Sequence, residues 1–430
     1  MELTELYRLF RESSGISTDS RSVKKGELFF ALRGQNYDGN IYVSEALNKG
    51  ASYAITDDTG CNKGRTVVVD NTLESLKSLA AFHRKILGVP VLAITGTNGK
   101  TTTKELIARI LSKKHRVHYT KGNFNNNIGL PLTILSAPYD TEIMVLEMGA
   151  NHQGEIRALC NIAMPDYGII TNIGTAHIEG FGSIGGVIRA KTELYEYLSS
   201  SGGIVIYNDE NPLLRDKVFS IVNKAVPYSF PAGTELRVEA LYSPMNLAVN
   251  IRNRHYSQDI QTGLFGSYNT ENVKAAAATG LFLRVEMNYI SEAISEYQPG
   301  NNRSQIRLTG KNTLVCDSYN ANPTSMLLSI RSFFNLDSER KVLILGDMLE
   351  LGESSGKEHK KIVDELIRLK PDKVILVGRN FIQAAAGSGY QTFEDLKALT
   401  EFLISEPLCG NHILIKGSRG MALERIYDIL

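Results

Sequence analysis

Short apolar runs recur along most of the chain, and longer stretches with apolar residues at helical spacing separate them. Between residues 86 and 299, such runs lie at 89–95, 143–147, 168–173 and 203–207. Uninterrupted apolar runs that alternate with helical segments are typical of strands in a parallel sheet covered on both faces. The pattern therefore predicts an α/β fold for this central part of the chain.

The two ends of the chain carry variants of the same pattern. Beyond residue 300, four runs with βαβ spacing predict a doubly wound, Rossmann-like domain. These runs lie at 313–317, 341–346, 373–378 and 411–416. The first 85 residues hold only short runs, at 27–32 and 66–69, around a helical stretch at 42–49, and predict a small α/β unit.

Two segments divide the chain into predicted domains. A chain of 430 residues exceeds one ordinary core, so two or three domains are expected. Gly88 precedes the first central run, and the turn-rich segment 298–303 precedes the last third of the chain. We therefore predict an α/β protein with three domains: a small N-terminal domain (1–85), a central domain with a mostly parallel sheet (86–299) and a C-terminal Rossmann-like domain (300–430).

Composition narrows the class of protein. Hydrophobic residues make up 43% of the chain and charged residues 22%, as in a soluble globular protein. The net charge is only +1, so electrostatics give no reason to expect binding to nucleic acid. The four cysteines are scattered singly, and no stretch approaches about 18 uninterrupted apolar residues. We expect a cytoplasmic protein that does not enter membranes.

The clearest chemical signal is a glycine loop between the run at 89–95 and a helical segment at 105–111. It reads Gly96, Thr97, Asn98, Gly99, Lys100, Thr101, Thr102. Backbone N–H groups in such a loop hold phosphate oxygens, the lysine reaches the β- and γ-phosphates, and the first threonine hydroxyl binds Mg²⁺. The strict P-loop pattern fails, because Ile94 stands where its first glycine belongs. The strand, glycines, lysine and threonine still predict a mononucleotide-binding P-loop domain.

Three further residues have a candidate role in chemistry. Glu147 ends the run at 143–147, where open α/β sheets bind ligands, and is either a Mg²⁺ ligand or a surface carboxylate. His177 lies in a glycine-bracketed loop and is either a ligand or a structural residue. Lys191 lies in a helical segment, and its position alone indicates a solvated residue.

Nine sequence blocks follow one another in the order found in a known enzyme family. They occupy residues 18–34, 96–104, 122–133, 147–151, 171–177, 190–193, 317–323, 345–352 and 416–419. Over essentially the whole chain these blocks resemble the Mur ligases, and within that family the MurF type. The resemblance implies a UDP-binding N-terminal domain, a central ATPase domain and a C-terminal ligase domain. It also implies a monomeric, ATP-dependent ligase that joins D-alanyl-D-alanine to UDP-N-acetylmuramoyl-tripeptide, a precursor of peptidoglycan.

The resemblance implies two Mg²⁺ sites. Thr101 and Glu147 would hold one ion, and Glu147 and His177 would lie near a second. Lys191 would be carbamylated by CO₂, which turns a cation into an anionic oxygen ligand for the second ion. His177 and Lys191, with Lys100 and Arg303, make up the implied catalytic set.

The resemblance also assigns residues to the substrates. The nucleotide would contact Asn269 and Asn272 at the adenine, and Arg303 and Asp317 when the domains close. The UDP-linked peptide would contact Ser20, Arg21, Arg33, Gly34, Asn125, Asn126 and Asn127. Structural loop hydrogen bonds and turn capping remain alternative roles for these polar residues.

The implied reaction brings a peptide carboxylate against the triphosphate of ATP. Two like charges 4 Å apart repel by about 4 kcal/mol at an effective dielectric near 20, so nearby cations are required. The later attack by an amine needs a base, which stays unassigned because a metal-bound His177 is poorly suited to accept a proton.

Other interpretations remain open. The sister Mur ligase that adds the third peptide residue carries an Asp-Asn-Pro-Arg motif, which this chain lacks. A folate polyglutamate ligase shares the ATP core but has no domain like residues 1–85. A P-loop switch protein and a non-enzymatic relative with a decayed site are further alternatives. Intact Lys100, Glu147, His177 and Lys191 argue against the decayed site.

Overall fold

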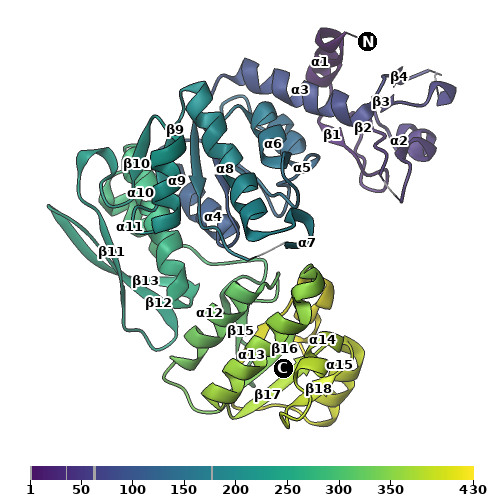
Figure 1. The fold of residues 1–430 in the computed structure, drawn as a ribbon. Coiled ribbons are helices and arrows are strands. Elements are labelled where there is room, and N and C mark those ends of the chain that lie inside the picture. The colour runs from purple at the N-terminus through teal and green to yellow at the C-terminus, as the bar shows by residue number, and fades with distance from the viewer. Residues whose placement is uncertain (1, 35, 62–63, 176–177) are drawn as a thin grey trace.

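The computed structural model describes residues 2–34, 36–61, 64–175 and 178–430, which fold into three domains (Figure 1). The domains form an arc, with the middle domain between the other two. Each domain is built on parallel strands with helices packed against them, so the predicted three-domain α/β architecture is confirmed. Within these ranges, no helix combines the length and the apolar character needed to cross a membrane.

The N-terminal domain is built on a parallel sheet with the strand order β1-β2-β3-β4. Its strands are β1 (Ile16–Ser17), β2 (Leu28–Phe30), β3 (Tyr53–Thr56) and β4 (Thr66–Val68). Its helices are α1 (Leu3–Glu12), α2 (Val43–Asn48) and α3 (Thr72–Leu87). β2 is buried along its whole length and forms the centre of this small domain.

Helix α3 connects the N-terminal domain to the middle domain (Figure 1). It begins after Asn71, whose side chain accepts a backbone hydrogen bond, and ends at Gly88 in the left-handed conformation (φ 62°). Near its end the buried Arg84 donates to two backbone carbonyls of the middle domain, at 2.9 and 3.2 Å, and pairs with Asp166 at 3.1 Å. These charge-assisted hydrogen bonds fix the helix against the middle domain.

The middle domain contains an entirely parallel sheet with the order β10-β9-β8-β5-β7-β6. Its strands are β5 (Val91–Thr95), β6 (Val117–Tyr119), β7 (Ile143–Glu147), β8 (Tyr167–Ile170), β9 (Ile204–Tyr207) and β10 (Ala225–Pro227). The intervening helices are α4 (Lys100–Ser112), α5 (Gly129–Leu135), α6 (Glu155–Ala163), α7 (Ile178–Phe181), α8 (Ile184–Ser201) and α9 (Pro212–Ile221). Apolar side chains cover both sheet faces, as predicted, and the carboxyl ends of β5, β7 and β8 meet at one edge.

Two predicted boundaries around the glycine loop are wrong. The helix after the loop begins at Lys100 rather than at residue 105. The strand predicted at 168–173 ends at Ile170, because the next two residues leave the sheet and bind the loop. Thr171 Oγ1 donates to the Asn98 carbonyl at 2.6 Å, and Asn172 Oδ1 accepts from the Asn98 N–H at 2.9 Å.

An antiparallel sheet of β11 (Arg237–Leu241), β12 (Asn246–Asn253) and β13 (Tyr256–Phe265) lies beside the parallel sheet of the middle domain. The apolar runs do not predict it, because its strands mix polar and apolar residues and are partly exposed. Helices α10 (Thr270–Phe282) and α11 (Met287–Ser295) follow. Leu264 of β13 pairs with Gln305 of β14 (Gln305–Leu308), so the ladder continues into the C-terminal domain.

The C-terminal domain has a parallel sheet in the order β15-β19-β16-β17-β18, with β14 antiparallel at its edge. Its strands are β15 (Thr313–Cys316), β16 (Lys341–Gly346), β17 (Lys373–Val377), β18 (Gln391–Phe393) and β19 (His412–Lys416). Helices α12 (Pro323–Phe334), α13 (Ser355–Leu369) and α14 (Arg379–Ala384) pack on one face. Helix α15 (Leu396–Ser405) and the C-terminal segment pack on the other, so the predicted doubly wound domain is confirmed.

Candidate active site

A cavity of about 1010 Å³ is lined by residues of the middle and C-terminal domains, together with Lys77 of helix α3, and includes the carboxyl end of β7. Residues that were predicted to bind the nucleotide, the metal or the peptide lie far apart in the sequence, yet they line this one cavity. The predicted residues that line it are Gly96, Thr97, Asn98, Gly99, Lys100, Thr101, Thr102, Asn125, Asn126, Asn127, Glu147, Lys191, Asn269, Asn272, Arg303 and Asp317.

Two glycines shape the loop between β5 and α4. Both have positive φ angles, 143° at Gly96 and 79° at Gly99. A Cβ atom on Gly96 would lie 2.1 Å from Thr171 Oγ1, and one on Gly99 would lie 2.3 Å from Asn272 Oδ1. Only glycine fits at either position. The Lys100 ammonium donates to the carbonyls of Gly96 at 2.8 Å and of Thr97 at 3.1 Å, so it is held against the loop.

Lys100 is a half-buried cation that lines the same cavity as a second cation, Arg303. Burial lowers the pKa of the Lys100 ammonium, Glu147 acts in the opposite direction, and the charge of Arg303 lowers the pKa further. In the described part of the chain, neither Lys100 nor Arg303 forms an ion pair. An anion bound near both groups would relieve their repulsion, so this part of the cavity is suited to phosphate.

Glu147, at the carboxyl end of β7, presents one uncommitted oxygen. The residue is 1% exposed, so the alternative of a surface carboxylate is wrong. Oε1 accepts a hydrogen bond from Asn125 Nδ2 at 2.8 Å, whereas Oε2 is buried without a hydrogen-bond partner among the described residues. Thr101, also buried, lines the same cavity. Mg²⁺ prefers oxygen ligands and commonly takes one or two from the protein and the rest from phosphate and water, so these two residues fit that ion.

Lys104 is a site residue that the sequence patterns miss. Its side chain is fully buried, and its Nζ lies 3.5 Å from Glu147 Oε2 without a hydrogen-bond partner in the described structure. Burial favours the protonated form of Glu147, but nearby cations outweigh burial and lower its pKa. These cations are, in order of effect, Lys104, Lys100 and Arg303. Its spacing from Thr101 could have indicated that Lys104 belongs to the site, because residues three positions apart lie on the same face of a helix.

Lys191, in α8, is buried inside the cavity wall rather than solvated. Its residue exposure is 3%, which excludes the solvated position that its place in a helix indicates. Its Nζ lies 5.5 Å from the centroid of the Phe181 ring, and no ion pair joins it to another described residue. Burial, with a smaller contribution from Lys100, lowers the pKa of Lys191 to about 7. His177, the other predicted metal ligand from this region, lies outside the described residues.

Two of the charged residues that the C-terminal domain contributes to the cavity differ in their pairing: Arg303 forms no ion pair among the described residues, whereas Asp317 does. The Arg303 guanidinium carbon lies 3.6 Å from the centroid of the Tyr319 ring, and the buried Nε has no hydrogen-bond partner in the described ranges. Asp317, at the end of β15, accepts from Lys416 Nζ at 2.7 Å. Asp317 is therefore balanced within its own domain, whereas Arg303 is available to an anion in the cavity.

Direct contacts join the C-terminal domain to the glycine loop. Asn322, which caps α12, donates from Nδ2 to Asn98 Oδ1 at 2.7 Å. The hydroxyls of Thr175 and Thr324 lie 3.3 Å apart. The loop thus touches the domain that supplies Arg303.

The two asparagines predicted at the adenine also have structural bonds. Asn269 donates to the Phe265 carbonyl at 2.7 Å and accepts from Asn272 Nδ2 at 2.7 Å. Asn272 Oδ1 accepts from the Thr103 hydroxyl at 3.1 Å. These bonds tie α10 to the helix that follows the loop, and the contact with adenine stays a prediction.

The three asparagines at 125–127, predicted to contact the peptide, have different surroundings in the structure. Asn125 binds Glu147, whereas Asn126 Oδ1 accepts from two N–H groups at the start of α5, at 2.8 and 3.1 Å. Turn capping, the alternative role for this run, therefore applies to Asn126. Asn127 is exposed at the cavity.

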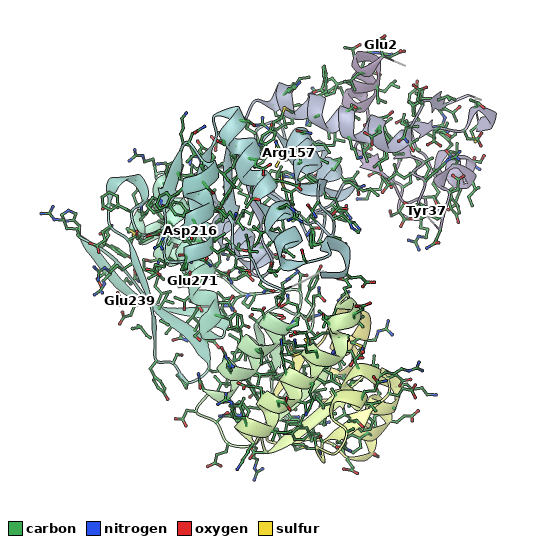
Figure 2. The ribbon with its side chains drawn as sticks, viewed as in Figure 1. Glu2, Tyr37, Arg157, Asp216, Glu239 and Glu271 are labelled. Carbon is green, nitrogen blue, oxygen red and sulfur yellow. The ribbon has the colours of Figure 1, made fainter. Side chains whose placement is uncertain are left out.

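The residues predicted to hold the UDP group lie in the N-terminal domain and do not line the cavity. Ser20 is buried, and Arg21 and Arg33 each pair with an aspartate of the same domain at 2.8 Å. Gly34 lies against the Tyr37 ring, which a Cβ atom would approach to 2.3 Å. Figure 2 shows Tyr37 at the edge of this domain that faces the C-terminal domain in that view.

Family models match most of the chain. The Mur ligase family catalytic domain matches residues 12–92, the Mur ligase middle domain residues 94–280, and the Mur ligase glutamate ligase domain residues 302–419. These matched segments follow the order of the three structural domains, with small differences at the boundaries.

Individual proteins are similar over nearly their full length. The UDP-N-acetylmuramoyl-tripeptide--D-alanyl-D-alanine ligase of Bacillus subtilis is 34% identical, with 96% of this chain and 92% of the relative covered. MurF from Acinetobacter baumannii superposes with a TM-score of 0.88 at 29% identity, covering 99% and 97% of the two chains. MurF from Thermotoga maritima, solved in complex with ADP, gives a TM-score of 0.85 at 26% identity, covering 98% and 97%.

Replacement of Lys104 by methionine tests its role as the counter-ion of Glu147. We expect Lys104→Met to lower the free energy of unfolding by about 3 kcal/mol, because the buried Glu147 loses its nearest cation. The double variant Lys104→Met, Glu147→Gln should recover a large part of that loss, since no uncompensated charge remains. Urea unfolding of the wild type, both single variants and the double variant measures this coupling. Strictly additive losses would show that the two charges do not support each other.

Proposed function

The chain belongs to the Mur ligase family, and we propose that it joins D-alanyl-D-alanine to the terminal carboxylate of UDP-N-acetylmuramoyl-tripeptide, with cleavage of ATP to ADP and phosphate. One observation carries the proposal. The glycine loop, a buried carboxylate and an unpaired arginine from another domain surround a single cavity. That combination suits phosphoryl transfer to an anionic acceptor, and the full-length relatives named for this ligation favour a peptide acid as the acceptor.

In the first step, an oxygen of the peptide carboxylate attacks the γ-phosphorus of ATP, the bond to ADP breaks, and an acyl phosphate forms. Lys100 and Arg303 balance the charge of the two anions and align them. Glycine-loop N–H groups at the start of α4 hold the phosphate oxygens. Mg²⁺, held through Thr101 and Glu147, supplies Lewis-acid stabilisation of the transferred phosphoryl group when bound.

In the second step, the amine of the dipeptide attacks the carbonyl carbon of the acyl phosphate. A tetrahedral intermediate forms and then expels phosphate, and the nitrogen loses a proton as the amide forms. We assign no residue to the acceptance of that proton, because His177 lies outside the described residues. Contacts of the C-terminal domain with the glycine loop would limit the access of water to the acyl phosphate.

A second Mg²⁺ and a carbamate on Lys191 complete the proposed centre. Carbamate formation joins the lysine nitrogen to the carbon of CO₂, releases a proton and leaves a carboxylate-like anion. Lys191 supports this role because it is buried, lines the cavity and lacks a counter-ion among the described residues. An anion there would also offset the nearby charge of Lys100.

The remaining substrate and the setting are proposed from the family resemblance. The N-terminal domain would hold the UDP group through Ser20, Arg21, Arg33 and Gly34. Both arginines are exposed, and a bound pyrophosphate would share their guanidinium groups with the aspartates that they already contact. The protein would act as a cytoplasmic monomer.

Ligation is tested by incubation of the protein with ATP, Mg²⁺, UDP-muramoyl-tripeptide and D-alanyl-D-alanine, followed by mass spectrometry. We expect the UDP-muramoyl-pentapeptide to form with one ADP per product, and ADP release to need both peptides. Lys100→Ala should reduce turnover at least about 100-fold, because the loop loses its cation. ATP hydrolysis without pentapeptide, unaffected by either peptide, would favour a nucleotide switch and refute the ligase.

Labelling with carbon-13 bicarbonate tests the carbamate on Lys191. An uncharged amine is the form that reacts with CO₂, and the Lys191 pKa of about 7 makes this form dominant above neutral pH. We expect a protein-bound carbamate signal in the carbon-13 spectrum at about pH 8.5, and its loss at about pH 6. Lys191→Arg should lack the signal at both values. An equal signal in wild type and variant would place the carbamate elsewhere.

A further inference from the structure

A second, smaller cavity adjoins the first beside the glycine loop. It has a volume of about 200 Å³ and is lined by Thr101, Gly122 and Asn123 of the middle domain and by Asn301, Arg303, Tyr319 and Arg419 of the C-terminal domain. Four of these residues, Thr101, Asn123, Arg303 and Tyr319, line the larger cavity as well, whereas Arg419 lines only the smaller one. The small cavity therefore opens toward the place where the acyl phosphate would form.

The charge of this small cavity is positive. Its two guanidinium groups flank one aromatic ring, with Arg303 at 3.6 Å and Arg419 at 5.7 Å from the Tyr319 centroid. Among the described residues, no acidic side chain lines the cavity. Arg303 lines both cavities, whereas Arg419 lines only the small one, so we assign a second anion in this space to Arg419.

The Arg419 side chain contacts Glu424 but remains largely exposed to solvent. Its Nη1 pairs with Glu424 Oε1 at 3.2 Å, and its side chain remains 61% exposed. The backbone N–H of Arg419 lies 3.4 Å from Asn320 Oδ1, which fixes the start of the side chain. A guanidinium oriented in this way can still offer two N–H groups to a carboxylate.

We propose that the small cavity binds the incoming dipeptide, with its C-terminal carboxylate on Arg419 and its amine directed toward Thr101. This inference rests on the proposed ligase function and names the residue that recognises its amine substrate. An extended dipeptide spans at most about 7 Å. The cavity's volume of about 200 Å³ is several times the ~30 Å³ that one water molecule takes up in the liquid, so it has room for a small ligand. Glu424 is a positioning residue that orients the guanidinium.

A substrate analogue without the carboxylate provides the sharpest test. D-alanyl-D-alaninamide keeps the reacting amine and both methyl groups but lacks the anion. We expect the wild-type enzyme to use it with a kcat/KM about 10- to 100-fold below that of D-alanyl-D-alanine. Arg419→Met should lose a similar factor with the dipeptide, through KM, and should no longer distinguish the dipeptide from its amide. The KM values for ATP and for the UDP-muramoyl-tripeptide should stay unchanged.

Two further variants control for indirect effects. Arg425→Met removes an exposed arginine from the same segment that lines neither cavity, and it should behave as the wild type. Glu424→Gln should raise the KM for the dipeptide less than Arg419→Met does, while discrimination against the amide is retained. Both variants separate loss of recognition from loss of folding.

Specific outcomes overturn the inference. If Arg419→Met ligates the dipeptide and still rejects the amide as the wild type does, the carboxylate binds elsewhere although the ligase function stands. If the KM for ATP rises instead, Arg419 serves the nucleotide. If the wild-type enzyme makes no pentapeptide at all, the proposed function fails together with this subsite.

Discussion

Negative charge crowds at the centre of any enzyme that activates a carboxylate with ATP, and this structure is arranged around the cations that balance it. Glu147 is already a buried anion before substrates arrive. Lys104, Lys100 and Arg303 together outweigh its burial and keep its pKa low. A single pair of like charges at 4 Å costs about 4 kcal/mol at an effective dielectric near 20, so the geometry of these cations governs whether the two reacting anions can approach.

The cations come from different parts of the chain, which explains why the site needs more than one domain. Two of them lie on α4, directly after the glycine loop, and are positioned by the parallel sheet. Arg303 comes from the C-terminal domain, whose Asn322 touches Asn98 of the loop. Because the same interface borders the small cavity with Arg419, the domain that completes the phosphate site also borders the proposed site for the amine.

Local features of the fold and site could be predicted from sequence, whereas features that depend on long-range packing could not. The glycine loop and Glu147 follow apolar strands directly, so contiguous patterns reveal them. Lys104 gives no such signal, because its burial arises only when α4 packs beside β6 and β7. The early end of β8 depends on hydrogen bonds from Asn172 to the loop, which no local propensity encodes. The antiparallel sheet was missed because its strands are half exposed and lack uninterrupted apolar runs.

Activation of the peptide carboxylate as an acyl phosphate is tested most directly by oxygen-18 labelling. UDP-muramoyl-tripeptide with both oxygens of its terminal carboxylate labelled is ligated to D-alanyl-D-alanine, and the phosphate and pentapeptide are weighed by mass spectrometry. One labelled oxygen should appear in each phosphate released and one should remain in the new amide, because attack by the amine breaks the carbon–oxygen bond of the acyl phosphate. Pentapeptide formed together with unlabelled phosphate would contradict this chemistry.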